Sequence, residues 1–308
     1  MKLKRSVIVI AGVHKGATTS MYEYLMQHDD ICAGRTKEIH YYTPLRYGRE
    51  LKPFEAYTAE FRDCGSERYV LDASPSYLYG GDLIAERIGN DFEGVKVIMM
   101  LREPTDRFVS FFNFLKSDFR LEGSVSFPLF MERSYELRDH DDTDDIYYRA
   151  FREGCYAEYL EPWLRRFGKD VKIVFFDDLK RDAAGTMREL CRWLGIDETI
   201  YRDPAMFEIK NKTRASKFKW VFLGASKINT FFEGFFRRHP RVKGGLRGIY
   251  FALFGARKQE TVNAEDRDAL RLLYREENRK LAKLLKQYGV GELPAWLQFD
   301  DTLPKGND

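Results

Sequence analysis

Apolar and polar positions follow two patterns along the chain, and together they predict an α/β fold. Short apolar runs, typical of buried parallel strands, begin at Val7, Tyr69, Val95 and Val171. Between these runs, apolar residues recur every three or four positions, which is typical of amphipathic helices. A chain in which such strands and helices alternate is expected to form a parallel sheet flanked by helices.

Start and stop signals give bounds to the main helices. The first helix is expected from about Thr18 to His28, and a later one from about Ala183 to Leu194, where Gly195 ends it. Pro104 opens a helix at a position where its missing N–H costs nothing. Asn263 caps the C-terminal helix, expected over about 263–289.

The first apolar run breaks at Gly12, and the residues that follow are suited to binding an anion. A strand that turns through glycine into a helix exposes the unpaired N–H groups of the first helical turn, and the helix dipole adds positive charge. Lys15, Thr18 and Thr19 add one cation and two hydroxyl donors. This stretch therefore predicts a phosphate site, unless the glycine turn only links the strand to the helix.

The spacing of this loop distinguishes between two nucleotide-binding patterns. The nucleoside-triphosphate P-loop requires the lysine directly before its Ser/Thr, whereas Lys15 lies three positions after Gly12. The run instead resembles the 5′-phosphosulfate loop of sulfotransferases, G-x-x-K-x-G-T-T, which bind 3′-phosphoadenosine 5′-phosphosulfate (PAPS). Ala17 stands where that family has glycine, and we expect Gly16 to supply the backbone freedom. The resemblance implies that PAPS is bound by Gly12, His14, Lys15, Gly16, Ala17, Thr18, Thr19 and Ser20.

A second segment, residues 37–42, combines charged and aromatic side chains. In an extended chain Glu38 and His40 would project to the same face. A carboxylate among aromatic residues can have its pKa raised toward the range of a general base, but Glu38 could equally pair with Lys37 at the surface. The segment resembles the K-E-x-H/Q-F/Y-F run of glycan-type sulfotransferases, which implies that Glu38 is the base. Histidine's ordinary pKa, near 6.5, keeps His40 open as the alternative.

A third motif begins where the strand from Val95 ends. Arg102 and Ser110 can converge on one anion, the guanidinium as a bidentate fork and the serine as a hydroxyl. The stretch resembles the family's 3′-phosphate signature, R-x-P-x-x-R-x-x-S-x-[FY], at every fixed position, with Arg107 and Phe112 included. The resemblance therefore implies that Arg102 and Ser110 bind the 3′-phosphate.

Composition and cysteine use set the compartment and exclude a metal site. The 308 residues are 44% hydrophobic, enough for a sizeable core, and the four cysteines form no C-x-x-C pair. We expect reduced thiols in a cytoplasmic protein. No apolar stretch is long enough to span a membrane, and the N-terminal run is interrupted by His14 and Lys15, which argues against a signal peptide or anchor. No metal is expected, because the aspartates between 139 and 145 lack the features of an EF-hand loop.

Charge is distributed unevenly. Residues 210–258 hold thirteen Lys/Arg against the single acid Glu233, a net charge of +12, so the rest of the chain carries −9. Ten aromatic residues accompany them. The segment could pack as the core of an acceptor lobe or lie on the inner face of a membrane; no nucleic-acid motif accompanies it. The resemblance implies that Lys212 and Arg214 lie in a loop that closes over the nucleotide.

These features lead to one prediction and two rivals. We expect a single sulfotransferase domain over residues 1–308, with a P-loop-NTPase-like sheet as the PAPS-binding core over about 1–200 and a helical, basic C-terminal acceptor lobe. Lys15 would neutralise the leaving phosphate and Glu38 would accept the proton of a carbohydrate, glycolipid or small-molecule hydroxyl. The rivals are a P-loop kinase that uses ATP and Mg²⁺, and a non-enzymatic nucleotide- or membrane-binding module.

Overall fold

The structure of the chain is a computed structural model that describes residues 5–139, 146–207 and 260–299. The contacts divide it into two compact units. The first comprises Met1–Arg107, Glu153–Ile209 and Arg271–Asp308, and the second comprises Phe108–Arg152 and Lys210–Leu270. We describe each unit by itself.

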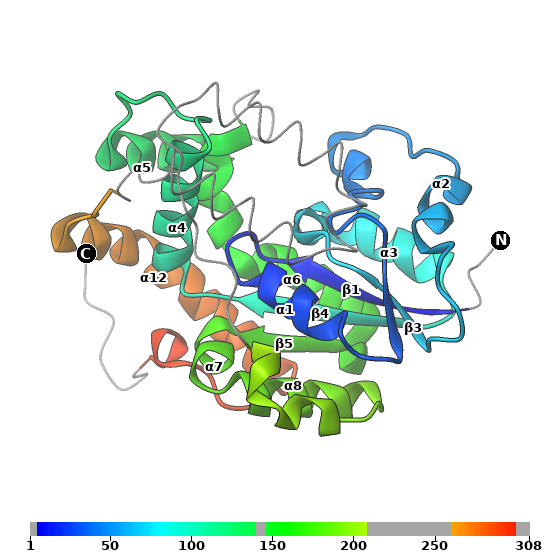
Figure 1. Cartoon of the computed structure of the whole chain (residues 1–308). Coiled ribbons are helices and arrows are strands. Elements are labelled where there is room, and N and C mark those ends of the chain that lie inside the picture. Colours follow the sequence, from blue (N-terminus) through cyan, green and yellow to red (C-terminus); the bar gives the residue numbers. More distant parts are fainter. Residues whose placement is uncertain (1–4, 140–145, 208–259, 300–308) are drawn as a thin grey trace, which may run out of the picture. The chain divides into compact units, whose positions relative to one another are not determined.

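The first unit is built on a five-stranded parallel sheet (Figure 1). The strands lie in the order β2-β3-β1-β4-β5, and all neighbours pair in parallel. Their bounds are β1 (Ser6–Gly12), β2 (Ile31–Ala33), β3 (Tyr69–Asp72), β4 (Val95–Leu101) and β5 (Val171–Phe175). The predicted α/β fold with a parallel sheet is confirmed.

The strand order brings several loops to one edge of the sheet. The chain runs from β1 outward to β2, returns through β3, and then crosses to β4 on the other side of β1. The direction of winding thus reverses between β1 and β4. In open parallel sheets ligands bind beyond the carboxyl ends of the strands at such a reversal. The loop that follows β1 contacts the end of β4 there, since the Val13 N–H donates to the carbonyl of Met100 at 2.9 Å.

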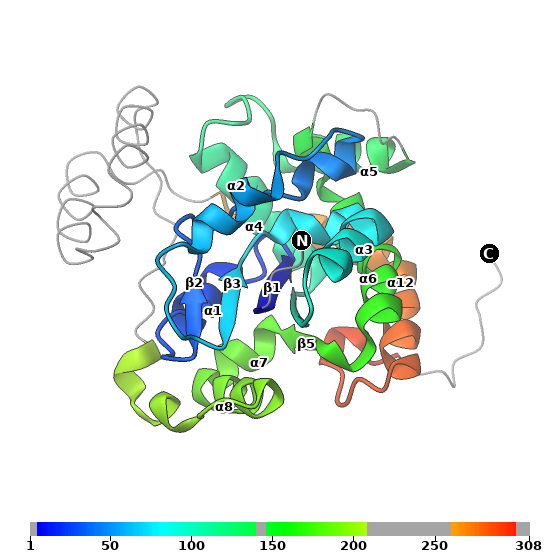
Figure 2. The same ribbon diagram turned by 90° about the vertical axis from the view of Figure 1, so that its right-hand side faces the viewer.

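Helices cover both faces of this sheet because the strands are apolar on both sides. Ile8 and Ile10 pack with α1 (Thr18–Leu25), α7 (Phe176–Arg181) and α8 (Ala183–Leu194). Val7 and Val9 face the opposite way, toward α3 (Gly81–Asp91) and α6 (Tyr156–Phe167). Figure 2 shows these two layers on either side of β1. The short α2 (Phe54–Thr58) and the C-terminal part of α12 (Ala264–Gln287) also pack on the second face.

The second unit has an aromatic core. The helix α4 (Pro104–Ser117) begins in the first unit, opened by Pro104 as predicted, and α5 (Phe127–Glu136) follows it. Rings of the second unit meet edge-on or tilted, and Phe130 lies 5.1 Å from Phe108 and 5.3 Å from Tyr148 between ring centroids. Such pairs add to the stabilisation that burial alone provides.

The described elements follow the predicted ones closely, with two differences. The helix α8 has the predicted bounds, and Gly195 ends it in the left-handed conformation with a φ of 69°. Asn263 caps α12 as predicted, its Oδ1 accepting from the Asp266 N–H at 2.7 Å. The strand β2 was not predicted, since three residues are too few for a periodic pattern. The first helix ends at Leu25 instead of His28.

The expectation that all four cysteines are reduced is wrong. Cys32 and Cys64 form a disulfide with a Cα–Cα distance of 5.8 Å. The reason is tertiary: β2 lies at the sheet edge, and the residues that follow it contact the turn near Glu60, whose carbonyl accepts from the Arg35 N–H at 2.9 Å. Cys155 and Cys191 are buried free thiols, as expected. Within the described ranges, no helix has the length and apolar character to cross a membrane.

Candidate functional site

The loop between β1 and α1 is held close to its neighbours. A Cβ added to Gly12 would lie 2.7 Å from Leu78 Cδ2, and one added to Gly16 would lie 2.8 Å from Val13 Cγ2 and 3.0 Å from the Met100 carbonyl. Both positions therefore require glycine for steric reasons. The loop leads directly into α1, whose N-cap Ala17 offers no side-chain acceptor to the first N–H groups. These donors are therefore available to an anion, such as the predicted phosphate.

The backbone freedom in this loop is not where we expected it. Gly16 is not among the residues with positive φ, whereas Lys15 and Ala17 adopt φ values of 66° and 69°. The left-handed conformation is costly for residues with a Cβ. Ala17, the position where the sulfotransferase pattern has glycine, therefore adopts the unusual conformation itself, and Gly16 serves close packing instead.

Arg102 links the end of β4 to this loop. Its Nη1 donates to the carbonyl of Lys15 at 3.1 Å, and its guanidinium lies over the ring of Phe176, 4.5 Å from the centroid. Burial lowers the pKa of Arg102 from its ordinary value, although nearby carboxylates such as Asp106 oppose that shift. Arg102 thus stands as a partly desolvated cation beside the predicted phosphate site.

Three other predicted nucleotide contacts, Ser110, Lys212 and Arg214, stay predictions. Ser110 lies on α4 but belongs to the second unit, and Lys212 and Arg214 lie outside the described residues, as do the aspartates from 140 to 145. Arg107, part of the same motif, is fully buried. Burial beside Tyr156 and Tyr274 suits it to stabilising the protein interior.

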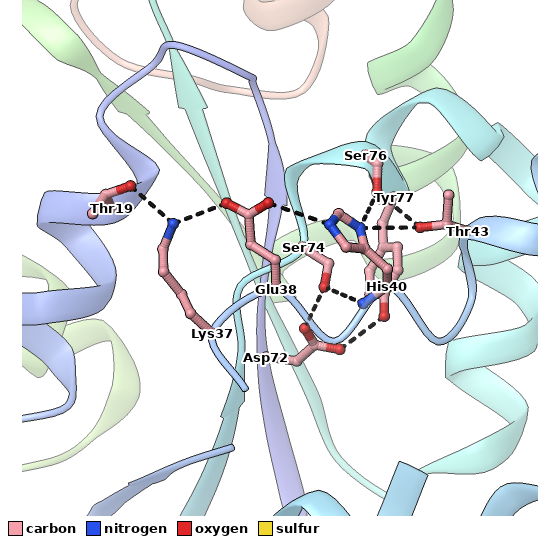
Figure 3. Close-up of polar contacts among 9 residues, drawn as sticks. All are labelled: Thr19, Lys37, Glu38, His40, Thr43, Asp72, Ser74, Ser76 and Tyr77. Carbon is pink, nitrogen blue, oxygen red and sulfur yellow. Dashed lines mark hydrogen bonds and ion pairs between the residues drawn. The ribbon is translucent and has the colours of Figure 1, made fainter. Parts of the chain in front are cut away.

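Lys37 joins the loop to the predicted base (Figure 3). Its ammonium donates to Thr19 Oγ1 at 2.8 Å and to Glu38 Oε1 at 2.9 Å. Glu38 Oε2 lies 3.3 Å from His40 Nε2. The two residues considered as bases are therefore in direct contact, and the surface pairing of Glu38 with Lys37 also occurs.

The electrostatic state of Glu38 differs from the expected one. Burial alone would raise its pKa, but the hydrogen bond with His40 and the charge of Lys37 outweigh burial and lower the pKa of Glu38 to about 2. The carboxylate is therefore ionised at neutral pH and stabilised as an anion. The expectation that aromatic surroundings raise this pKa is wrong.

The segment that carries His40 is a turn instead of an extended strand. His40 has a φ of 54°, and its backbone N–H donates to Ser74 Oγ at 3.1 Å. Its Nδ1 lies 3.0 Å from Ser76 Oγ, which in turn lies 2.8 Å from Thr43 Oγ1. Glu38 and His40 thus lie together because the chain turns. The two side chains do meet, but the prediction that an extended segment brings them together is wrong.

Behind this turn lies a buried carboxylate that sequence reasoning missed. Asp72 ends β3 with no exposed surface and accepts hydrogen bonds from Ser74 Oγ at 2.7 Å and Tyr77 Oη at 3.0 Å. Burial raises the pKa of Asp72 to about 6, opposed in part by these hydroxyls. The signal available in the sequence was an aspartate at the end of an apolar strand, two positions before a Ser-Pro-Ser-Tyr turn.

A second buried carboxylate, that of Glu153, contacts His14 in the loop between β1 and α1. Glu153 Oε1 accepts from Arg46 Nη1 at 3.0 Å, and its Oε2 lies 3.7 Å from His14 Nδ1. The guanidinium of Arg46 also lies 5.0 Å from the ring centroid of Tyr79. Burial favours the neutral acid, but the nearby His14 and the charge of Arg46 outweigh burial and lower the pKa of Glu153 to about 2. His14 is thereby fixed by a partner distant in sequence, which no spacing could predict.

No metal centre accompanies these residues in the described ranges, since no three His, Cys, Asp or Glu side chains gather there as a metal would require. The charged groups near the loop include the cations Lys15, Lys37 and Arg102 and the anion Glu38, besides the Arg46–Glu153 pair at His14. Together with α1's N-terminal donors, they provide an anion-binding site adjacent to a carboxylate that can accept a hydrogen bond or a proton.

Comparison with known proteins gives the same assignment as the loop. Residues 5–238 match the model of the sulfotransferase domain family. Curated relatives include mouse heparan sulfate glucosamine 3-O-sulfotransferase 3B1, 28% identical over 62% of this chain and 46% of the relative. The Drosophila melanogaster bifunctional heparan sulfate N-deacetylase/N-sulfotransferase is 21% identical over 95% of this chain and 27% of the relative. The chain thus spans less than half the length of these two relatives.

A solved structure shares the fold. The sulfotransferase from Alicyclobacillus acidocaldarius superposes with a TM-score of 0.66 at 22% identity, over 96% of this chain and 100% of that chain.

Proposed function

The chain belongs to the sulfotransferase domain family, and from this premise we propose that it moves a sulfuryl group from PAPS to an acceptor hydroxyl. The observation that carries the proposal is the bridge formed by Lys37, which connects Thr19 of the phosphate loop to the ionised Glu38. A donor bound at the loop would lie next to a carboxylate able to accept a proton.

The transfer is an in-line displacement at sulfur. The acceptor oxygen forms a bond to sulfur while the bond from sulfur to the bridging oxygen breaks, and adenosine 3′,5′-bisphosphate leaves with that electron pair. Lys15 and the N–H groups of α1 stabilise the charge that develops on the leaving phosphate. Glu38 accepts the proton of the hydroxyl. The catalytic contribution is therefore positioning and charge stabilisation, as in phosphoryl transfer.

The low pKa of Glu38 limits its strength as a base in the free protein. Lys37 is the group that an arriving anion would attract, because its ammonium already touches the loop at Thr19. If Lys37 turns from Glu38 toward the sulfated phosphate, the carboxylate loses one of the cations that hold its pKa down. Binding of PAPS would then raise the pKa of Glu38 and make it a stronger base.

The acceptor class follows from the relatives. Both curated relatives named above act, by their names, on heparan sulfate, so we propose a carbohydrate hydroxyl, free or on a glycolipid, as the acceptor. We also keep a single functional domain as a proposal, with the second unit contributing to acceptor binding. The compartment remains a prediction: we proposed the cytoplasm, yet the Cys32–Cys64 disulfide is of a kind more typical of oxidising compartments.

Calorimetry with three ligands tests the cofactor. Adenosine 3′,5′-bisphosphate should bind more tightly than adenosine 5′-phosphate and than ATP with Mg²⁺. Arg102→Ala should weaken binding of the bisphosphate about thirtyfold, the loss expected for one charge-assisted contact. It should weaken binding of adenosine 5′-phosphate only slightly. Transfer of labelled sulfate from PAPS to a panel of glycans then tests the reaction. Tighter binding of ATP and phosphate transfer would show a kinase instead.

A further inference from the structure

The turn that brings His40 to Glu38 rests on a buried carboxylate. Asp72 and Ser74 have no exposed surface, and Ser74 Oγ lies 2.7 Å from Asp72 Oδ1. The second carboxylate oxygen accepts from Tyr77 Oη at 3.0 Å. Each oxygen of the Asp72 carboxylate thus accepts a hydrogen bond from one hydroxyl group, which fixes the orientation of the carboxylate (Figure 3).

The direction of the hydrogen bonds follows from the number of protons. Ser74 has one hydroxyl proton, and it donates that proton to the carboxylate of Asp72. Its oxygen can therefore only accept from its other neighbour, the backbone N–H of His40 at 3.1 Å. A series of two hydrogen bonds runs from the His40 backbone through Ser74 to Asp72. A negative acceptor at its end strengthens both.

This series stabilises a conformation that His40 would not adopt alone. A φ of 54° is unfavourable for a residue with a Cβ, and the bond from its N–H compensates for part of that cost. The same conformation directs the imidazole back so that Nε2 lies 3.3 Å from Glu38 Oε2. If His40 left this conformation, its N–H would lose Ser74 Oγ, and the 3.3 Å contact between the imidazole and Glu38 would no longer be held in place by the turn.

We propose that Asp72 is a positioning residue for the acid–base pair of this enzyme, acting through Ser74 on the backbone of His40. This inference rests on the proposed sulfuryl transfer, because it gives Asp72 a part in setting the geometry of the proposed base. Asp72 does not touch substrate. Its effect is to hold His40, and through His40 the carboxylate of Glu38, in the arrangement that a hydroxyl acceptor meets.

Two variants that remove the same kind of bond separate positioning from stability. Ser74→Ala removes one hydroxyl from Asp72 and also breaks the connection to the His40 N–H. Tyr77→Phe removes the other hydroxyl, together with the longer 3.4 Å bond that this hydroxyl accepts from the Tyr42 N–H, and leaves the bond from the His40 N–H to Ser74 intact. We expect Ser74→Ala to lower kcat at least tenfold, with the Kd for adenosine 3′,5′-bisphosphate within about twofold of the parent. Tyr77→Phe should change kcat by less than about threefold.

Hydrogen exchange of the His40 amide provides a readout that does not depend on activity. By NMR, the His40 N–H should exchange at least about tenfold faster in Ser74→Ala than in the parent protein, and at the parent rate in Tyr77→Phe. If Ser74→Ala does not fold, Asp72→Asn takes its place, since it keeps the shape but removes the charge. It should speed exchange of the His40 amide about threefold or more.

The outcomes distinguish this inference from the proposed function. Equal loss of kcat in Ser74→Ala and Tyr77→Phe, or an unchanged His40 exchange rate in Ser74→Ala, would overturn the positioning role of Asp72; for Asp72→Asn, an unchanged rate would do the same. If the parent protein transfers no sulfate from PAPS, the proposed function fails. The exchange rates still decide whether Asp72 holds the His40 turn.

Discussion

Glu38 is held between a lysine and a histidine side chain, and that arrangement decides how it can act. Lys37 contacts one carboxylate oxygen at 2.9 Å and His40 approaches the other at 3.3 Å. These contacts lower its pKa to about 2, so the carboxylate is ready to accept a hydrogen bond but is a weak base until one partner moves. We expect His40 to orient the carboxylate, which it contacts, and the acceptor.

Substitution of each residue distinguishes these roles. We expect Glu38→Gln, which keeps the shape but cannot take a proton, to lower kcat by on the order of 10² or more while bisphosphate affinity stays nearly unchanged. His40→Asn should cost less, because it only loosens the orientation of Glu38. Single-turnover assays measure both. An inactive His40→Asn beside a nearly normal Glu38→Gln would identify His40 as the base.

Ala17 offers a prediction about stability at a single residue. Its left-handed φ of 69° favours glycine, so Ala17→Gly should raise the free energy of unfolding by about 0.5 to 1 kcal/mol. The matched control is Ala56→Gly, at an exposed position of α2, which should lower it by a similar amount. Urea unfolding measures both. A loss of stability at both positions would contradict the account of the loop.

At the scale of elements, the site consists of strand ends. Strands β1, β3 and β4 could be predicted because their apolar runs are long, and their chain order places the residues after them at one edge. The loop glycines and Arg102 were predictable because they lie at or just after the ends of β1 and β4. The short β2, the turn at His40 and the partners Asp72 and Glu153 were not, since they depend on contacts between residues far apart in sequence.

The disulfide between Cys32 and Cys64 joins β2 to the turn after α2, directly before the segment that carries Lys37 and Glu38. The cysteines are 32 residues apart, so closing that loop in the unfolded chain should contribute about 3 to 4 kcal/mol. Cys32→Ser/Cys64→Ser should lower the free energy of unfolding by up to that amount, measured by urea unfolding.

A reductant provides the control for this variant. It should destabilise the parent protein to the level of the double variant and leave the double variant unchanged, because Cys155 and Cys191 are buried free thiols. A parent protein as stable with reductant as without it would show that the disulfide contributes nothing.

The end of β3 should make stability depend on pH. The folded pKa of Asp72, about 6, exceeds its ordinary value of 3.8, so the folded state favours the protonated acid. Its contribution is complete below pH 3.8 and is lost as pH rises through 6, a total of about 3 kcal/mol. Asp72→Asn cannot titrate. Relative to the variant, the parent protein should lose about 2 kcal/mol between pH 4.5 and 7.5, measured by urea unfolding at each pH; a constant difference would contradict the buried ionisation of Asp72.

At the scale of the whole molecule, charge is the main asymmetry. A net charge of +12 over residues 210–258 against −9 elsewhere cannot be read from any strand or helix pattern, and that segment lies outside the described residues. The sequence therefore predicts its electrostatics but not its packing. An anionic surface and an anionic acceptor would both be attracted to it.

Vesicle binding tests whether that charge acts on a membrane. Each basic residue near an anionic surface contributes about 1 kcal/mol, so the chain should sediment with phosphatidylglycerol vesicles at low salt and be released as salt screens the attraction. Phosphatidylcholine vesicles should bind little. Arg237→Glu/Arg238→Glu, which removes two of the thirteen basic residues and adds two acids, should weaken binding by at least about thirtyfold. If the parent protein stays in solution with phosphatidylglycerol at low salt, the segment serves the protein interior or the acceptor, and the membrane prediction fails.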